Sequence, residues 1–208
     1  MTKLQRDAII AAALDLLDET GAENLTTRRL AERLGVQQPA LYWHFRSKRA
    51  LLDALAHAML AEGRQGARPR PGQDWREFLA DNARGFRRAL LSRRDGALIH
   101  AGTRPVDPEF DAVEAQFALM REAGFAPLDA AHALTTVGHY VVGAVLEEQA
   151  AAVEAGSRPA DAPPAALAEV FDAYDRAGPE AAFEFGLDVM LDGLAARLAR
   201  RASAPSGG

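Results

Sequence analysis

The sequence has no cysteine, and it also has no long uninterrupted apolar stretch. Without cysteine the chain can form neither disulfides nor thiolate metal sites, which fits a reducing compartment. No window approaches the ~18 consecutive apolar residues that a membrane-spanning helix needs. The N-terminal stretch MTKLQRDAII contains Asp7 and no apolar core, so it does not read as a signal peptide. We therefore expect a cytoplasmic protein.

Strand patterns and internal repeats are missing as well, because nearly every segment places its apolar residues at helical spacing. Hydrophobic residues make up 49% of the 208 positions, enough to bury a sizeable core. We predict an all-α protein with helices at residues 5–20, 27–34, 39–44, 47–61, 74–91, 107–123, 127–155, 167–176 and 180–201. The expected organisation is a small domain at 1–62, a Gly/Pro/Arg linker at 63–73, a larger domain at 74–203 and a disordered tail at 204–208.

Basic charge is scarce overall but concentrated in one segment. The formal net charge is −5, which argues against a general nucleic-acid binder. Residues 24–50, however, carry six basic side chains against one acidic side chain, a net of +5. Residues 51–208 carry 16 basic and 23 acidic side chains, a net of −7. A basic segment on an acidic body is the electrostatic footprint of a nucleic-acid-binding head.

The basic segment contains the pattern of a helix-turn-helix, TRRLAERLGVQQPALYWH at residues 27–44. Gly35 permits a left-handed turn between the two helices, and the small Ala31 lets them pack closely. The residues expected to make the apolar contacts are Leu30, Leu34, Val36, Leu41 and Phe45. The second helix then presents polar and aromatic side chains that suit DNA recognition. The alternative is a small helical hairpin whose aromatic patch is covered by the rest of the protein.

If this head reads the major groove of DNA, each side-chain type has a role. Gln38 can bond an adenine edge, and Arg28 has the fork that matches a guanine edge. Pro39 and Ala40 offer small apolar surfaces for a thymine methyl group. The residues expected to hold phosphates are Thr27, Tyr42, His44 and Lys48. We expect Trp43, at the same surface, to anchor the helix rather than to read bases.

The stretch DGALIHAGTRPVDPEF, at residues 95–110, interrupts the helical pattern near the middle of the chain. A helical run up to Ile99 meets His100, which is followed by glycine and prolines. His100 is either a helix end, where it interacts with the helix dipole, or part of a sensing site on a hinge. The other candidates for such a site share helix faces in pairs, Asn82 with Phe86 and His139 with Glu147.

The chain resembles the TetR family of transcriptional repressors, and within it the tetracycline-responsive members. The likeness rests on LTTRRLAERLGVQQPALYWHFRSKRALLDAL in the head and on ALLSRRDGA, GTRP, VGH and AFEFGL further along. It runs without an obvious gap from the N-terminus to about residue 150 and resumes after the loop at residues 156–165. The resemblance implies a helix-turn-helix DNA-binding domain, a helical ligand-binding and dimerisation domain, and no enzymatic activity.

The resemblance also implies an inducer pocket for a tetracycline that chelates a magnesium ion. Asn82 and Gln116 would hydrogen-bond the drug, and Phe86 would pack on its rings. The other residues implied to line the pocket are Arg64, Arg104, Pro105, Ala131, Leu134, Gly138 and His139.

For the metal, the resemblance implies that His100 is a direct ligand. Thr103 would hold a metal-bound water, and Glu147 of the partner subunit would reach the metal shell through water. A hard cation prefers oxygen ligands and keeps several waters, so one imidazole cannot hold it unaided. We therefore expect the magnesium ion to arrive with the inducer and to bind weakly without it.

Two positions depart from the family pattern. Arg64 stands where close members carry a histidine that bonds the inducer, and a guanidinium cannot accept a hydrogen bond. Ala131 stands where the family carries a bulky aliphatic residue, which should enlarge the pocket. These departures leave open a repressor of the same family with a different inducer. A metal-dependent hydrolase that uses His100, His139 and Glu147 is a remote alternative, because no HExxH or similar spacing occurs.

The C-terminal helices carry an apolar stripe wide enough for a core and a partner, formed by Phe183, Leu187, Met190, Leu191, Leu194 and Leu198. Two long helices from each of two subunits would form a four-helix interface with twofold symmetry. A monomer whose stripe is wholly internal is the alternative. A homodimer would read a palindromic operator whose half-sites lie about one helical turn apart. The inducer would favour a state in which the two heads no longer match that spacing.

Overall fold

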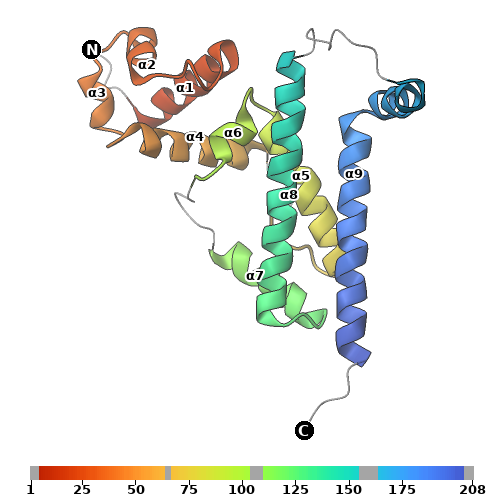
Figure 1. Cartoon of the computed structure of the whole chain (residues 1–208). Coiled ribbons are helices and arrows are strands. Elements are labelled where there is room, and N and C mark those ends of the chain that lie inside the picture. Colours follow the sequence, from red (N-terminus) through yellow and green to blue (C-terminus); the bar gives the residue numbers. More distant parts are fainter. Residues whose placement is uncertain (1–4, 64–66, 104–109, 155–163, 204–208) are drawn as a thin grey trace. The chain divides into compact units, whose positions relative to one another are not determined.

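The structure is a computed structural model of the chain, and it describes residues 5–63, 67–103, 110–154 and 164–203. In these ranges the regular secondary structure is helical throughout, which confirms the all-α prediction. The helices are α1 (Arg6–Thr20), α2 (Thr27–Leu34), α3 (Pro39–Tyr42), α4 (Lys48–Gly63), α5 (Trp75–Leu91), α6 (Gly96–His100), α7 (Phe110–Glu122), α8 (Pro127–Glu154) and α9 (Ala165–Ser203) (Figure 1). Within the described ranges, no helix is long and apolar enough to cross a membrane.

Local side-chain chemistry explains where several helices begin and end. The Thr26 hydroxyl accepts a hydrogen bond from the Arg29 amide at 3.2 Å, and the Ser47 hydroxyl accepts one from Ala50 at 3.1 Å. A carboxylate oxygen of Asp74 accepts from two amides of the first turn of α5 in the same way. Glycines in left-handed or related conformations follow α1, α2 and α7, at the three positions where the sequence predicts helix ends.

Contacts group the chain into two compact units, and this grouping is not linear. Unit 1 consists of Met1–Gln65 with Gly85–Phe110, and unit 2 consists of Gly66–Arg84 with Asp111–Gly208. Helix α5 therefore begins in unit 2 and ends in unit 1. The expected domains at 1–62 and 74–203 assign all of α5 and α6 to the second domain, whereas the contacts place α6 with the N-terminal helices.

Unit 1 is built around one cluster of buried apolar side chains. The fully buried members come from α1, α2 and α4 and from the loop after α1, and α6 adds Ile99. The loop before α6 is tied to α1 and to the residues that follow it, because Arg93 pairs with Asp18 at 2.9 Å and the Asp95 carboxylate accepts from the Ala22 amide at 2.8 Å. The cluster includes Leu30, Ala31 and Leu41, so it supports the helix-turn-helix from its inner side.

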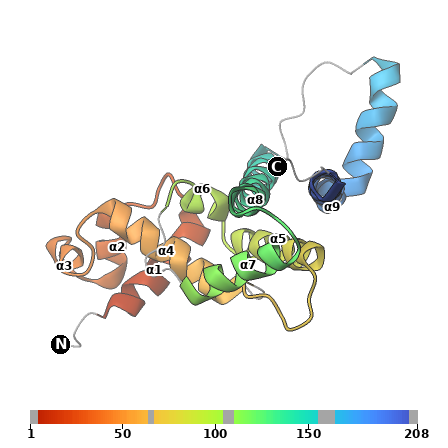
Figure 2. The same ribbon diagram turned by 90° about the horizontal axis from the view of Figure 1, so that it is seen from below.

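Unit 2 is dominated by the packing of α8 on the C-terminal part of α9, and these two segments run side by side in Figure 1 and are seen nearly end-on in Figure 2. Val137, Val141 and Val145 of α8 are buried, as are Phe183 and Leu187 of α9. Gly178 and Pro179 break the helical geometry within α9, at the place where the sequence predicts a boundary between two helices. Only the part of α9 after this kink contributes residues to the core described here.

Residues 67–73, the described part of the expected linker, are anchored on unit 2 rather than extended. Gln73 is buried, and its side chain bonds both to the Arg70 amide and to Asp81 of α5. These residues therefore form a turn that is bonded to α5. Glycine and proline serve here to form a tight turn, which composition alone does not distinguish from a flexible connection.

Candidate nucleic-acid interface and effector site

The helix-turn-helix of unit 1 is built as the sequence predicts. Gly35 adopts φ 64° and ψ 29°, and the amides of Gly35 and Val36 bond to the carbonyls of Glu32 and Ala31. This pair of bonds is the Schellman motif, which ends α2 and turns the chain toward α3. Leu30, Leu41 and Phe45 are buried beneath the two helices. Helix α3 is shorter than expected: it ends at Tyr42, and residues 43 and 44 form a turn.

The outer surface of the head is exposed and aromatic. Trp43 is 90% exposed and Tyr42 is 47% exposed. The expectation that Trp43 anchors the helix is therefore wrong, since its ring has almost no contact with the chain. Within unit 1, the rings of Trp43 and Tyr42 therefore lie outside the buried core. An exposed tryptophan on a basic segment is available to a partner.

The predicted DNA-reading residues meet at the start of α2 and α3. Gln38 donates from its amide nitrogen to the Thr27 hydroxyl at 2.7 Å, so these two side chains lie against each other. Arg28 is exposed, and its guanidinium donates to Glu32 at 3.0 Å within α2. The remaining predicted contacts comprise half-buried Ala40 and His44 and exposed Pro39, Tyr42 and Lys48.

An ion pair missed by the sequence reasoning fixes α2 against α1. Arg33 donates through both terminal nitrogens to Glu19, at 2.6 and 2.7 Å. The hydrogen bond from Arg33 lowers the pKa of the Glu19 carboxyl below its ordinary value and raises the pKa of Arg33. The two residues are 14 positions apart and on different helices, so only their opposite charges could have suggested the pair.

Three of the predicted effector residues come together within unit 1. The rings of Phe86 and His100 lie edge to face, with centroids 5.0 Å apart. The Thr103 hydroxyl donates to the His100 carbonyl at 2.7 Å, which closes the turn after α6. The predicted residues Arg64, Arg104 and Pro105 lie outside the described residues.

The other predicted effector residues belong to unit 2. Asn82 is half-buried on α5, and Gln116 on α7 is buried. The amide nitrogen of Gln116 donates to the Ala67 carbonyl at 2.6 Å, a contact that sequence spacing could not suggest. On α8 the half-buried residues are Ala131, Leu134 and Gly138, and the exposed residues are His139 and Glu147.

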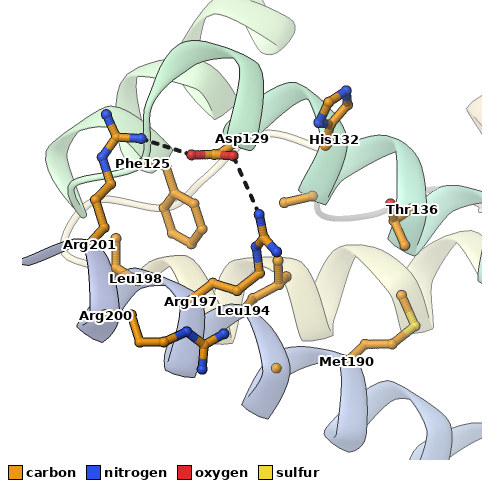
Figure 3. A pocket seen from close by; sticks show the side chains of 12 residues that line it. Phe125, Asp129, His132, Thr136, Met190, Leu194, Arg197, Leu198, Arg200 and Arg201 are labelled. Atoms are coloured by element: carbon orange, nitrogen blue, oxygen red, sulfur yellow. Dashed lines mark hydrogen bonds and ion pairs between the residues drawn. The ribbon is translucent and has the colours of Figure 1, made fainter. Parts of the chain in front are cut away.

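A groove of about 860 Å³ lies between the start of α8 and the end of α9 (Figure 3). Arg201 and Arg197 reach Asp129 across it, at 2.9 and 4.0 Å. Its apolar lining includes Met190, Leu194 and Leu198 of the expected stripe, whereas Phe183, Leu187 and Leu191 are buried within the unit. Half of the predicted stripe therefore belongs to the core of unit 2, and the other half lines the groove. Of the predicted effector residues that the structure describes, none lines the groove.

Comparisons with known proteins match two family models to the chain, one to its N-terminal helices and one to most of the remainder. Residues 9–55 match the family described as "Bacterial regulatory proteins, tetR family", and residues 68–198 match "Tetracyclin repressor-like, C-terminal domain". The chain is 59% identical over 201 residues to the tetracycline repressor protein class A from transposon 1721 of Escherichia coli, covering 95% of this chain and 93% of that protein.

Solved structures give the same result. A crystal structure of TetR from Acinetobacter baumannii AYE has a TM-score of 0.83 at 51% identity and covers 94% of this chain and 99% of its own. TetR class A in complex with 5a,6-anhydrotetracycline and magnesium has a TM-score of 0.75 at 53% identity and covers 92% and 98%. These relatives are repressors and not enzymes, which sets aside the hydrolase interpretation. The chain belongs to the TetR family of bacterial regulatory proteins.

Proposed function

We propose that this protein is a ligand-responsive transcriptional repressor that binds a palindromic operator as a homodimer. A magnesium-chelated tetracycline is the proposed inducer. The observation that carries the proposal is the 59% identity to a tetracycline repressor, which extends over 95% of the chain and so includes both the head and the effector residues. The exposed head, with Arg28 and Gln38 on its surface, supports the DNA-binding part.

In the proposed operator complex, some side chains of the head contact base edges and others contact phosphates. Gln38 presents an amide and Arg28 a guanidinium, the two groups that bond adenine and guanine edges bidentately. The Arg28–Glu32 pair is exposed, so DNA can replace it at little cost. Lys48 at the start of α4 supplies a phosphate contact that fixes the register.

The effector residues fit a magnesium ion that arrives with its ligand. His100 with the neighbouring Thr103 hydroxyl offers only part of a shell, and hard cations need more oxygen donors than that. When bound, the ion would supply a positive charge that a chelating inducer brings to His100. The chain's own contribution is to orient the imidazole, whose ring is restrained by its edge-to-face contact with Phe86.

The test is release of operator DNA measured by fluorescence anisotropy. Purified protein is bound to a labelled palindrome selected from randomised half-sites, and anhydrotetracycline is added with Mg²⁺ or with EDTA. We expect release at low drug concentration with Mg²⁺ and release only at far higher concentration with EDTA. His100→Ala should retain operator binding and lose the difference between the two titrations.

The same titration distinguishes a tetracycline inducer from a different, unspecified inducer. Failure of saturating drug to release wild-type protein would contradict the tetracycline assignment and favour a different inducer, as the charged Arg64 and the small Ala131 suggest. Failure to bind any selected palindrome would contradict the repressor itself. A His100→Ala variant that still responds to Mg²⁺ would remove His100 from the metal site.

A further inference from the structure

Residues 67–73, here called the strap, connect to one of the proposed inducer-binding residues. The strap begins at Ala67, whose carbonyl accepts a hydrogen bond of 2.6 Å from the buried Gln116 side chain. Because a carbonyl can only accept, the group that faces Ala67 must be the amide nitrogen of Gln116. The bond therefore fixes which end of the amide points toward the strap. The carbonyl oxygen and the second N–H of Gln116 are left for other partners.

The strap is folded by a turn of defined chemistry. Pro71 and Gly72 occupy its central positions, Gly72 has φ +76°, and the Gln73 amide donates to the Arg70 carbonyl at 3.1 Å. Proline followed by a glycine at positive φ is the composition of a type II turn. The Gln73 side chain strengthens the turn, since its oxygen accepts from the Arg70 amide at 3.0 Å.

Two carboxylates of α5 hold the turn in place. Glu77 and Asp81 lie four residues apart and so share a helix face. One guanidinium nitrogen of Arg70 lies 2.7 Å from Glu77 and 2.9 Å from Asp81. The same Asp81 oxygen also accepts from the Gln73 amide at 3.0 Å. The strap is thus fixed to α5 by charge-assisted bonds at one end and reaches Gln116 of α7 at the other.

We propose that the strap is a positioning element of the inducer site, in which Arg70 and Gln73 hold the strap on α5 and Ala67 sets the amide of Gln116. This inference rests on the proposed function, because it assigns Gln116 to inducer binding. A fixed amide presents its oxygen and its remaining N–H to the inducer in one orientation. The site then favours ligands that place a donor at this oxygen and an acceptor at this N–H. A ligand with the two groups exchanged would require a flipped amide, which would leave the Ala67 carbonyl without this partner.

The experiment measures the affinity of anhydrotetracycline with Mg²⁺ for the full-length protein by fluorescence titration. Arg70→Gln and Asp81→Asn should each weaken binding roughly tenfold, as loss of a group that orients a ligand-binding side chain does. Arg76→Gln is the matched control. It removes an exposed pair of the same kind on α5, Arg76 with Asp192 at 2.6 Å, which does not touch the strap, and it should leave the affinity unchanged.

A structural role and a positioning role give different double-mutant results. If the strap acts through Gln116, Arg70→Gln should have no further effect in a Gln116→Ala protein. An equal loss in both backgrounds, or no loss in either, would overturn the proposal. Arg70→Lys keeps the charge but not the shape that serves both carboxylates, and it should recover only part of the affinity.

A ligand-free measurement keeps the inference independent of the inducer assignment. In ¹⁵N-glutamine-labelled protein, the side-chain NH₂ signal that disappears in Gln116→Ala identifies Gln116. Its two protons should exchange with water at different rates in the wild type, because one is bonded to Ala67, and at similar rates in Arg70→Gln. Unchanged exchange in Arg70→Gln would overturn the strap's role. Failure of wild-type protein to bind the drug would instead contradict the proposed function alone.

Discussion

At the scale of single residues, the predicted readers of DNA are already engaged with neighbours. Gln38 bonds Thr27, and Arg28 bonds Glu32. We expect Gln38→Ala and Arg28→Ala each to cost about 1–3 kcal/mol of operator binding and to relax the preference at one base pair, because a bidentate base contact is lost. The measurement is anisotropy with the selected palindrome and with single-base variants of it at fixed salt concentration.

Glu32→Ala is the matched control for the Arg28 substitution. It removes the partner of Arg28 and one negative charge from the basic head, so operator affinity should stay the same or increase. Equal affinity of Arg28→Ala, Gln38→Ala and wild-type protein for the palindrome would show that other residues read the bases.

Residue type predicted most of the head but not the position of each side chain. Leu30 and Leu41 could be assigned to the core because their spacing and chemistry leave no other role, and both are buried. Trp43 could not, since an indole suits an apolar core and an exposed recognition surface equally well. The bond from Gln116 to Ala67 joins residues 49 positions apart, which no local pattern encodes.

At the scale of helices, the crossing of α8 and α9 depends on one glycine. Gly186 faces Tyr140, and a Cβ atom placed there would overlap the phenol oxygen and ring. Tyr140 cannot simply move, because its hydroxyl donates to the Phe183 carbonyl at 2.9 Å and its ring stacks on Phe183. We expect Gly186→Ala to destabilise the ligand-free protein by about 1–3 kcal/mol in urea unfolding.

Gly138→Ala supplies the comparison within the same pair of helices. Apart from the backbone of α8 and the two adjacent residues, no atom of the described residues lies within 4 Å of a Cβ atom at Gly138, so the usual gain of about 1 kcal/mol from replacing a helical glycine should appear. Tyr140→Phe in the Gly186→Ala background removes the overlapping oxygen and should recover part of the lost stability. A Gly186→Ala protein as stable as the Gly138→Ala protein would contradict the close crossing.

Helix boundaries were predictable because caps and stops are local. Thr26, Ser47 and Asp74 accept amide hydrogen bonds at the helix starts where the sequence places them. The strap was not predictable, since its Pro-Gly turn is held by Glu77 and Asp81, which a reading of residues 63–73 alone does not include. The grouping of α6 with the N-terminal helices likewise depends on contacts between distant segments.

At the scale of the whole molecule, the proposed function requires a second copy of the chain. Phe185 is 74% exposed and Val189 is 55% exposed on the part of α9 that packs on α8, and both lie outside the core of unit 2. The groove between the two helices adds half-buried Met190 and Leu194. An apolar surface of this kind on paired helices fits the four-helix interface predicted from the sequence.

Val189→Asp tests the dimer, because a carboxylate buried against a second apolar surface has no compensating charge. Sedimentation at micromolar concentration should give the mass of one chain for the variant and of two for the wild type. Trp43→Asp is the control: it places the same charge at a more exposed apolar position in the head and should leave the mass at two chains.

The monomeric Val189→Asp variant should also lose at least about a hundredfold in affinity for the palindrome, since the second head no longer binds as part of the same molecule. A Val189→Asp protein that remains dimeric would place the interface elsewhere, whereas a wild-type monomer that still binds the palindrome tightly would remove the dimer from the mechanism.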